Sequence, residues 1–541
     1  MMQRIFGNRS SIDLGSSEFR EFITKGNLYV DKTRFIEHVL KEASRVLLFT
    51  RPRRTGKSLN LDMLRTFLDC KQDTKELFKG LYIDGSPLFG RINSAPVIYL
   101  NFRRLDGSSY EAVYSELLKE NARRYLENDQ LGEFFQRCVT GEYPRTAGAL
   151  YALIKDIHEA RGIRPYVLID EYDKLLMDNI NSAEYETIRG WLKSLFESTL
   201  KDNPHLEKGI MAGVTRVSHE GLLSGLNNLD VYDVFRASEF DGDFSLTEEE
   251  ATELLSAEQL EVAREWYNNY RVGGKKLYTM YSVLSYAKNG ALDNYWGMSG
   301  SIETLINALN TDRTDAISDL LSTGNEITSM IERRLSLRQL RSGDIEDSSY
   351  YSYAVQTGYL TYELQLTGDI DDIYRLRVPN KELVRVWRDF ILKGVLKDKH
   401  NNLRDIFKNI SDTEEFSHNF QEFISFQLSS YDIGKELEKT YHVLVFGLIL
   451  GAGFKCSSNK ERGYGRYDLW LEGPDFNVII EFKRGTKPTE DLEALACNAV
   501  EQIDQRKYYT QFPKNVPLYK VGVGCYKSEC FVTTALHGNE R

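Results

Sequence analysis

The stretch RVLLFTRPRRTGKSLNLDML, residues 45–64, constrains the fold of this chain more than any other segment. An apolar run is followed at once by a short basic loop that ends in Gly-Lys-Ser, and then by an amphipathic run. This order is typical of a phosphate-binding loop, where a buried strand leads through a tight turn into the N-terminus of a helix. The segment therefore predicts a strand, a loop and a helix of a parallel α/β sheet.

The loop offers most of the side chains that bind a nucleotide, with one departure from the usual pattern. We expect Lys57 to reach the β- and γ-phosphates and the hydroxyl of Ser58 to bind Mg²⁺. Arg51 occupies the position of the first glycine. The loop alone therefore fits either a nucleotide site or a basic turn before a helix. The candidate nucleotide-binding residues here are Arg54, Thr55, Gly56, Lys57 and Ser58.

Two further apolar segments end in polar residues. YVLIDEYD carries Asp170 and Glu171, and IMAGVTR ends in Thr215 and Arg216. Parallel strands present their carboxyl ends at one edge of a sheet, where ligands bind. We expect Asp170 to hold Mg²⁺ through water and Glu171 to orient an attacking water. Thr215 would sense the γ-phosphate and Arg216 would neutralise it. Each pair alone also fits an ordinary strand end, but the loop, the carboxylates and the polar tip together favour an ATP site.

A second constellation lies near the C-terminus, in ERGYGRYDLWLEGPDFNVIIEFKRG, where a Gly-Pro-Asp turn joins two predicted strands. Because strand side chains alternate, Glu481 and Lys483 should share one face while Phe482 points to the other. The hairpin can bring Asp468 beside Glu481. Two carboxylates and a main-chain carbonyl can hold Mg²⁺ or Mn²⁺, and the lysine can position an attacking water on a phosphodiester.

The short Glu-x-Lys motif also fits a solvated surface strand, but its surroundings argue against that interpretation. The apolar residues before Glu481 indicate a buried strand, and charges at such a strand need a partner or a metal. The upstream helix KELEKTYHVLVFGL offers Glu436 or Glu438 as a further ligand. The downstream helix ALACNAVEQIDQRKYY places Gln502 and Lys507 where they can contact a phosphate backbone.

These motifs resemble a bacterial AAA-ATPase-like family that carries a C-terminal PD-(D/E)XK nuclease domain. The likeness is carried by YVDKTRFIEHVL, FTRPRRTGKS, LIDEYDKLL and MAGVTRVSHEGLLSGLNNLDVYDVF, and later by EKTYH, SNKERGYGRYD, IIEFK and QIDQRKYY. The resemblance implies that Arg51 is compatible with ATP binding and that Asp31 and Lys32 lie near the nucleotide. The candidate catalytic residues are Glu171, Glu438, Asp468, Glu481, Lys483 and Gln502.

The length of 541 residues is too great for one hydrophobic core and predicts several domains. The runs RVLLFT, APVIYLNF, RPYVLIDEYD and KGIMAGVTR alternate with helical stretches, which predicts a P-loop NTPase domain with a parallel sheet over residues 1–245. A helical lid region over 246–345 should follow, then a winged-helix-like or connecting region over 346–415 that contains a β-hairpin. Residues 416–541 should form an α/β domain of the restriction-endonuclease type.

Composition narrows the class of protein. A net charge of −11 argues against a generally basic nucleic-acid coat, although local basic patches remain compatible with it. No apolar run approaches the ~20 residues of a membrane span, and the N-terminus has no apolar core of signal-peptide length. Six cysteines without a CxxC pair form neither a disulfide framework nor a zinc motif. We therefore expect a cytoplasmic protein without a membrane partner.

The sequence predicts an ATPase fused to a Mg²⁺-dependent nuclease, with ATP and Mg²⁺ or Mn²⁺ as cofactors. The expected partner is nucleic acid, with DNA preferred over RNA, and ATP is expected to gate cleavage. A homo-oligomer is left open, because Arg216 can complete its own site or that of a neighbour. Two alternatives are a regulatory NTPase whose nuclease fold only binds nucleic acid or protein, and an ATP-dependent assembly module.

Overall fold

The computed structural model describes most of the chain, and its described part divides into two compact units. The first unit comprises Met1–Ser299 and Thr328–Glu382, and the second comprises Gly300–Ile327 and Leu383–Arg541. Among the described helices, none has both the length and the apolar character that a membrane span requires. The described residues are 4–105, 109–139, 148–217, 222–223, 225–297, 305, 313, 317, 320–321, 326–335, 345–365, 373–387, 400–429, 445–449, 452, 454, 455–458, 461–462, 465–487, 489–511, 516–526 and 529–538.

A five-stranded parallel sheet forms the centre of the first unit, in the order β4-β5-β6-β3-β7 within the described part. The four apolar runs expected to be strands form β3 to β6, so the predicted α/β class is confirmed. The edge strand β7 was not expected, because it is four residues long and only one of them is buried. The strands are β3 (Val46–Thr50), β4 (Val97–Asn101), β5 (Tyr166–Asp170), β6 (Lys208–Gly213) and β7 (Leu229–Tyr232).

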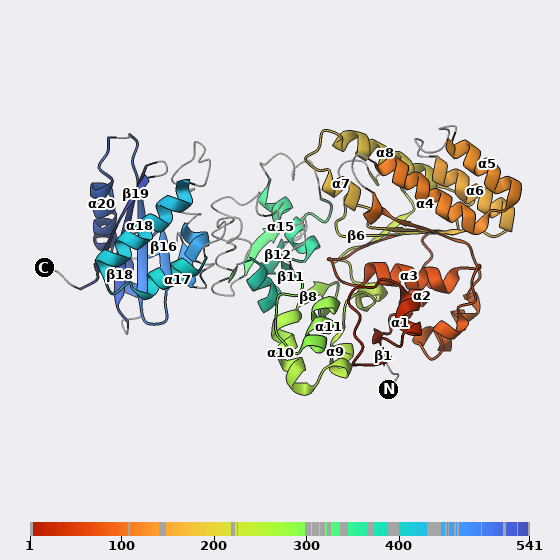
Figure 1. The fold of residues 1–541 in the computed structure, drawn as a ribbon, viewed down its shortest axis with the longest axis horizontal. Helices are drawn as coiled ribbons and strands as arrows, with labels where there is room; N and C mark the ends of the chain where they lie inside the picture. The colour runs from red at the N-terminus through yellow and green to blue at the C-terminus, as the bar shows by residue number, and fades with distance from the viewer. Residues whose placement is uncertain are drawn as a thin grey trace. The chain divides into compact units, whose positions relative to one another are not determined.

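Helices cover both faces of this sheet (Figure 1). On one face, apolar side chains of α1, α2 and α3 form a core with alternate residues of the strands, among them Leu47, Phe49 and Leu168. The opposite face is covered by α4, α6 and α8, with α5 packed alongside (Figure 1). The helices are α1 (Phe19–Thr24), α2 (Arg34–Lys41), α3 (Lys57–Leu68), α4 (Tyr110–Tyr125), α5 (Asn128–Val139), α6 (Ala149–Arg161), α7 (Lys174–Asp178) and α8 (Tyr185–Leu200).

The rest of the first unit is mostly helical, as the sequence indicates, but it contains a β-hairpin that was not expected. The hairpin β8–β9 turns at Gly273, whose φ of +54° suits glycine. The hairpin expected later in the chain is present as antiparallel β11 and β12. Strand β10 lies beside β12 as the third strand of this sheet. The elements are β1 (Ile5–Phe6), β2 (Tyr29–Val30), α9 (Glu248–Leu254), α10 (Ala257–Tyr267), β8 (Tyr270–Val272), β9 (Lys275–Leu277), α11 (Met280–Asn289), β10 (Ile327–Met330), α15 (Asp347–Thr357), β11 (Thr361–Gln365) and β12 (Ile373–Arg377).

A mixed five-stranded sheet forms the centre of the second unit, in the order β13-β16-β17-β18-β19 within the described part. Strands β17 and β18 run parallel, and the other neighbours are antiparallel. One face packs on α17 and α18, and α20 covers the other (Figure 1). The elements are α17 (His400–Lys408), α18 (Thr413–Ser429), β13 (Lys455–Ser458), β14 (Glu461–Arg462), β15 (Gly465–Arg466), β16 (Leu469–Glu472), β17 (Asn477–Arg484), α20 (Leu492–Arg506), β18 (Leu518–Tyr526) and β19 (Glu529–Leu536).

The helix α20 lies unusually close to β18. A Cβ atom added to Gly522 would stand 2.0 Å from the carbonyl oxygen of Ala496, and one added to Gly524 would stand 2.2 Å from that of Leu492. Glycine therefore allows the helix backbone to approach the strand. This approach fixes the face of α20 that meets the centre of the sheet, where the candidate nuclease residues lie.

Short 3₁₀ helices complete the described structure. Their bounds are η1 (Lys75–Leu77), η2 (Tyr82–Gly85), η3 (Pro87–Arg91), η4 (Phe102–Arg104), η5 (Glu239–Gly242) and η6 (Tyr508–Gln511). The four domain ranges expected from the sequence stay predictions.

Candidate functional site

The loop between β3 and α3 has the backbone of an anion-binding turn. Strand β3 ends at Thr50, and α3 begins at Lys57. Gly56 caps the helix with a left-handed φ of +87°, a conformation that glycine adopts without strain. The first N–H groups of a helix have no partner within the helix, and they carry partial positive charge. The loop therefore directs backbone donors at the position where a phosphate would lie.

The amine of Lys57 is buried inside this loop. Its Nζ donates to the carbonyl oxygens of Arg51 at 3.0 Å and Pro52 at 2.8 Å. Burial lowers the pKa of Lys57 to about 8, although the nearby carboxylate of Glu171 acts in the opposite sense. Both acceptors of the amine are neutral carbonyls. A bound anion would therefore stabilise its charged form strongly.

The side chain of Arg51 explains why an arginine replaces the first glycine of the loop. It is only 1% exposed, and its Nη1 donates to the carbonyl oxygens of Thr50 at 2.9 Å and Tyr232 at 2.6 Å. The guanidinium also lies over the ring of Phe244, 5.4 Å from its centroid. Arg51 is not among the residues with positive φ, so its backbone does not require glycine. The side chain joins the ends of β3 and β7 instead of crowding the loop.

The other two loop residues expected to bind nucleotide are held by protein groups. Arg54 has a positive φ of 63°, donates to the carbonyl oxygen of Tyr295, and lies over the ring of Tyr281 at 4.3 Å. Thr55 donates its hydroxyl to the carbonyl oxygen of Pro52 at 2.9 Å. Because both side chains are engaged in these contacts, a phosphate would meet the backbone N–H groups of the loop rather than these two side chains.

The two residues expected to bind Mg²⁺ in the nucleotide site meet at the carboxyl edge of the sheet. Asp170 ends β5 and is hydrogen-bonded by the side chain of Ser58. The hydroxyl of Tyr99 donates to Asp170 Oδ2 at 3.4 Å. Burial raises the pKa of Asp170, so a cation beside it would favour the ionised form. A hydroxyl and a carboxylate are oxygen donors of the kind that Mg²⁺ prefers.

Glu171 follows Asp170 with an uncommon backbone. Its φ is +52°, in the left-handed region that non-glycine residues seldom occupy. Burial raises the pKa of its carboxyl, and the charge of Lys57 opposes the shift. Strained backbone of this kind persists where the surrounding structure holds it, often at functional sites. The conformation brings the Glu171 carboxylate within electrostatic reach of Lys57.

Thr215 is tied to a residue that sequence reasoning missed. Asp173 Oδ2 accepts the Thr215 hydroxyl at 2.9 Å and the backbone N–H groups of Thr215 and Val214 at 2.8 and 3.0 Å. Asp173 thereby joins the segment after β5 to the end of β6. The third acidic residue in YVLIDEYD was the only sequence signal for this role.

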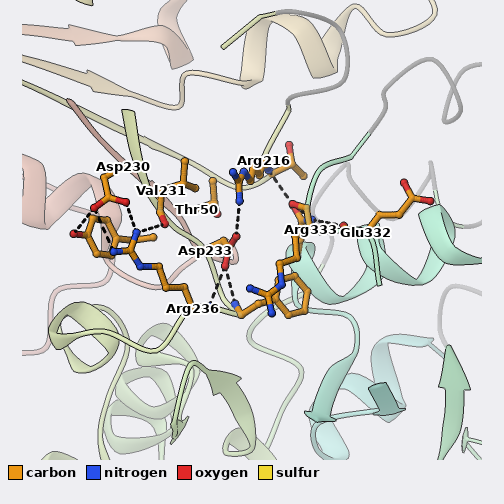
Figure 2. A network of polar contacts seen from close by, with 12 residues as sticks. Thr50, Arg216, Asp230, Val231, Asp233, Arg236, Glu332 and Arg333 are labelled. Atoms are coloured by element: carbon orange, nitrogen blue, oxygen red, sulfur yellow. Dashed lines mark hydrogen bonds and ion pairs between the residues drawn. The ribbon is translucent and has the colours of Figure 1, made fainter. Parts of the chain in front are cut away.

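Arg216 pairs with a carboxylate of its own chain (Figure 2). Its Nη1 lies 3.1 Å from Asp233 Oδ2, and its backbone N–H donates to the side chain of Gln356 at 2.9 Å. The other oxygen of Asp233 accepts the backbone N–H groups of Phe235 and Arg236. The side chain expected at the γ-phosphate is thus held in a network that extends to α15.

Asp31 and Lys32 are bound within the fold. Lys32 Nζ donates to both carboxylate oxygens of Glu250, at 2.8 and 2.7 Å, and to the carbonyl oxygen of Gly242 at 2.9 Å. Asp31 accepts the backbone N–H and the hydroxyl of Thr33. The Lys32 contacts fasten the start of α2 to α9. They give the YVDKT segment a structural role within the unit that contains the phosphate loop.

The C-terminal carboxylates lie side by side, as the hairpin suggested. Leu469 pairs with Ile480, so Asp468 stands opposite Glu481. The backbone N–H of Asp468 donates to Glu481 Oε2 at 3.2 Å, and Asp468 Oδ2 accepts the backbone N–H of Phe482 at 2.7 Å. Glu481 is 3% exposed, and burial together with the charge of Asp468 raises its pKa to about 8.

Gln502 of α20 bridges the acidic and basic members of this cluster. Its Nε2 donates to Glu481 Oε1, while its Oε1 accepts from Lys483 Nζ. Gln502 also donates to the hydroxyl of Tyr508 at 3.3 Å. Phe482 packs in the core on the opposite face, so the side chains alternate as predicted. The structure therefore brings Asp468, Glu481, Lys483 and Gln502 together.

The buried carboxylate of Glu481 and the half-buried carboxylate of Asp468 lie side by side, and a divalent cation would stabilise such a donor set. Within the described residues, no group of three His, Cys, Asp or Glu side chains has the geometry of a metal site. Glu438, the further ligand expected from the sequence, lies outside the described residues, as does its alternative Glu436. Lys507, expected to contact a phosphate backbone, is the C-cap that follows α20 and has a φ of +52°.

Comparisons with known proteins cover both clusters. Residues 13–223 match the family model described as "Predicted AAA-ATPase", and residues 436–535 match the PD-(D/E)XK nuclease superfamily. A protein of Azotobacter chroococcum mcd 1, described as an uncharacterized protein in the vnfD 5′ region, is 29% identical over 410 residues, or 73% of each chain. A solved structure of the Aeropyrum pernix ORC2 protein in ADPNP–ADP complexes is 13% identical, covers 72% of this chain and 99% of its own, and has a TM-score of 0.33.

Proposed function

Because residues 13–223 form an AAA-ATPase-like domain and residues 436–535 form a PD-(D/E)XK nuclease superfamily domain, we propose that the protein is an ATPase that controls a metal-dependent nuclease. The observation that carries the nuclease half is the buried carboxylate of Glu481 beside the half-buried Asp468, connected to Lys483 through Gln502. A domain that only binds nucleic acid has no need to bury one carboxylate beside a second one, since this arrangement costs free energy.

In the ATPase half, Lys57 binds the β- and γ-phosphates, and the loop N–H groups up to Gly56 cradle them. Ser58 and Asp170 hold Mg²⁺, and Glu171 orients the attacking water. Support comes from the hydrogen bond between Ser58 and Asp170 and from the desolvated amine of Lys57. Thr215 and Arg216 respond to the γ-phosphate from the neighbouring strand.

In the nuclease half, Asp468 and Glu481 hold Mg²⁺ or Mn²⁺, with Glu438 as a further ligand. The metal, when bound, polarises a phosphodiester and lowers the pKa of a water. Lys483 holds its charge near the attacking water and the phosphate. Gln502 keeps Lys483 and Glu481 at a fixed separation, because one amide contacts both side chains. The substrate class is nucleic acid, with DNA preferred.

The test is cleavage of labelled single- and double-stranded DNA and RNA with Mg²⁺ or Mn²⁺, with and without ATP. Wild type should cleave at least one substrate, and Glu481→Gln should lose cleavage while remaining folded. Glu472→Gln is the matched control, because Glu472 lies on the adjacent strand and pairs with Lys455 at the surface, at 2.9 Å. Lys57→Ala should abolish ATP hydrolysis and the effect of ATP on cleavage.

Absence of cleavage from a folded wild-type protein would contradict the nuclease assignment. If that protein still bound nucleic acid and hydrolysed ATP, a regulatory NTPase with a binding-only nuclease fold would take its place. Equal cleavage with and without ATP, and equal cleavage by Lys57→Ala, would contradict the gating.

A further inference from the structure

The outer side of the phosphate loop is covered by residues far away in the sequence. The indole Nε1–H of Trp296 donates to the carbonyl oxygen of Arg53 at 3.3 Å, and Arg54 donates to the carbonyl oxygen of Tyr295. Two consecutive residues of the segment after α11 thus contact two consecutive residues of the loop. Trp296 is among the largest fully buried side chains, and its ring meets that of Tyr359 edge-on, with 4.9 Å between centroids.

A buried carboxylate anchors this segment. Glu382 is 0% exposed, and its two oxygens accept the Ser282 hydroxyl, each at 2.9 Å. One of them also accepts the backbone N–H of Trp296 at 2.8 Å. A buried charge costs free energy unless hydrogen bonds compensate for the lost water. These neutral donors supply that compensation for Glu382. The hydrogen bonds fix Trp296 to α11 and to the helical residues 381–387.

A phosphate bound at Lys57 would change the hydrogen bonds beside Trp296. Lys57 Nζ donates to the carbonyl oxygen of Pro52, and the next carbonyl, that of Arg53, accepts from Trp296. A phosphate at Lys57 competes for the same amine, so the hydrogen bond from Lys57 Nζ to the Pro52 carbonyl oxygen weakens. Because the two carbonyls belong to adjacent peptide groups, a reorientation at Pro52 alters the geometry of the Trp296 bond. A ligand can shift a conformational equilibrium only through contacts that differ between the free and bound states. The hydrogen bond from Lys57 to the Pro52 carbonyl oxygen is such a contact.

We propose that Trp296 and Glu382 sense the conformation of the phosphate loop and transmit it along the chain into the second unit. Glu382 is the last residue of the first unit, and Leu383 begins the final segment of the second. Both lie in the helical residues 381–387. The inference rests on the proposed ATP binding and names the route by which nucleotide regulates cleavage. Trp296 and Glu382 are positioning residues, since neither contacts the candidate phosphate-binding amine.

The test measures amide hydrogen exchange of peptides spanning residues 381–387 in the full chain, with and without ATP and a non-hydrolysable ATP analogue. Nucleotide should change exchange there in wild type. Trp296→Phe keeps the aromatic packing but removes the N–H donor, and most of the change should be lost in this variant. Glu382→Gln and Ser282→Ala should each weaken the same response, since each removes part of the anchor of Trp296. Ser282→Ala serves as the second variant if Glu382→Gln does not fold.

Trp191→Phe is the matched control, because Trp191 is buried in α8 against Tyr110 and Tyr114 and should leave the response intact. Nucleotide binding by Trp296→Phe, measured alongside, should stay within about threefold of wild type. A full exchange response in Trp296→Phe would overturn the inference alone. Absence of nucleotide binding to wild type would overturn the proposed ATPase, and the inference with it.

Discussion

At the scale of single residues, the two candidate sites place ionisable groups in opposite electrostatic situations. Lys57 is a buried cation whose pKa falls to about 8, and Glu481 is a buried acid whose pKa rises to about 8. In both cases burial disfavours the charged form, and a ligand of opposite charge reverses that effect. Each site should therefore exchange protons when its ligand binds.

ATP binding should take up protons through Lys57. At pH 8 the amine is about half charged, and a phosphate beside it raises its pKa. We expect an uptake of about half a proton per Mg·ATP at pH 8 and about a tenth at pH 7. Calorimetric titration in buffers of different ionisation enthalpy measures this number. Equal uptake at both pH values would show that another group is responsible.

Replacing Glu481 should change how stability depends on pH. The folded pKa of about 8 exceeds the ordinary value of 4.5, so the folded state binds more protons between these values. Stability of wild type should therefore decrease as pH rises from about 4.5 to 8, by a few kcal/mol. Glu481→Gln cannot ionise and should lack that decrease, so its melting temperature should exceed that of wild type at pH 8.

The measurement is thermal unfolding from pH 5 to 9 in the presence of EDTA. Near pH 5 the two proteins should melt at similar temperatures. Mg²⁺ should raise the melting temperature of wild type at pH 8 more than that of Glu481→Gln. Parallel curves for the two proteins over the whole range would contradict the assigned shift.

The sequence predicted single residues well where their neighbours are set by strand order. Lys57, Ser58 and Asp170 meet because parallel strands end at one edge, a consequence of topology that motifs reveal. Glu382 could not be found in this way. Its partner Ser282 lies 100 residues away in the sequence, and the segment VPNKEL, which contains Glu382 and shares in the family resemblance, gives no sign of what that carboxylate binds.

At the scale of elements, strand periodicity was the most informative signal. The alternation of Glu481, Phe482 and Lys483 predicted which face of β17 carries the chemistry. Strand β7 and the hairpin β8–β9 were missed, because strands of three or four residues contain too few alternations to stand out from a loop. Their positions are decided by packing on the neighbouring sheet and helices, which local sequence does not encode.

The close packing of α20 on β18 leads to a prediction about elements. In Gly522→Ala, the new Cβ would meet the backbone oxygen of Ala496 at 2.0 Å, which no side-chain movement can relieve. The helix must shift, displacing Gln502 from Glu481. We expect a loss of about 1–3 kcal/mol, as for overpacked cores, together with a strong loss of cleavage. Thermal unfolding and the cleavage assay measure the two effects.

Gly485→Ala is the control for this prediction. Its Cβ would meet first the carboxylate oxygen of Glu490 at 3.1 Å, at the end of a flexible side chain. Gly485→Ala should therefore fold and cleave like wild type. If Gly522→Ala behaved in the same way, α20 would not be held at the distance described here.

At the scale of the whole molecule, the contacts of Arg216 indicate whether this residue completes the ATP site of its own chain or that of a neighbouring subunit. An arginine that completes the site of a neighbouring subunit should be free to extend from its own chain. Arg216 is instead paired with Asp233 at 3.1 Å (Figure 2). Its backbone N–H also donates to the side chain of Gln356 in α15. We therefore expect Arg216 to act on the ATP site of its own chain.

Mixing two inactive variants tests this expectation. Arg216→Ala and Lys57→Ala should each lower ATP turnover at least about tenfold, since arginines at the γ-phosphate have large effects. If Arg216 acts within its own chain, a mixture of the two variants has no intact site and stays inactive at any ratio. If Arg216 acts on a neighbour, mixed oligomers contain a Lys57 site completed by a wild-type Arg216, and turnover recovers. Sedimentation with ATP should accompany the assay, because a mixture that never associates cannot recover. Recovery of turnover in co-sedimenting mixtures would show that the pair with Asp233 opens when subunits assemble.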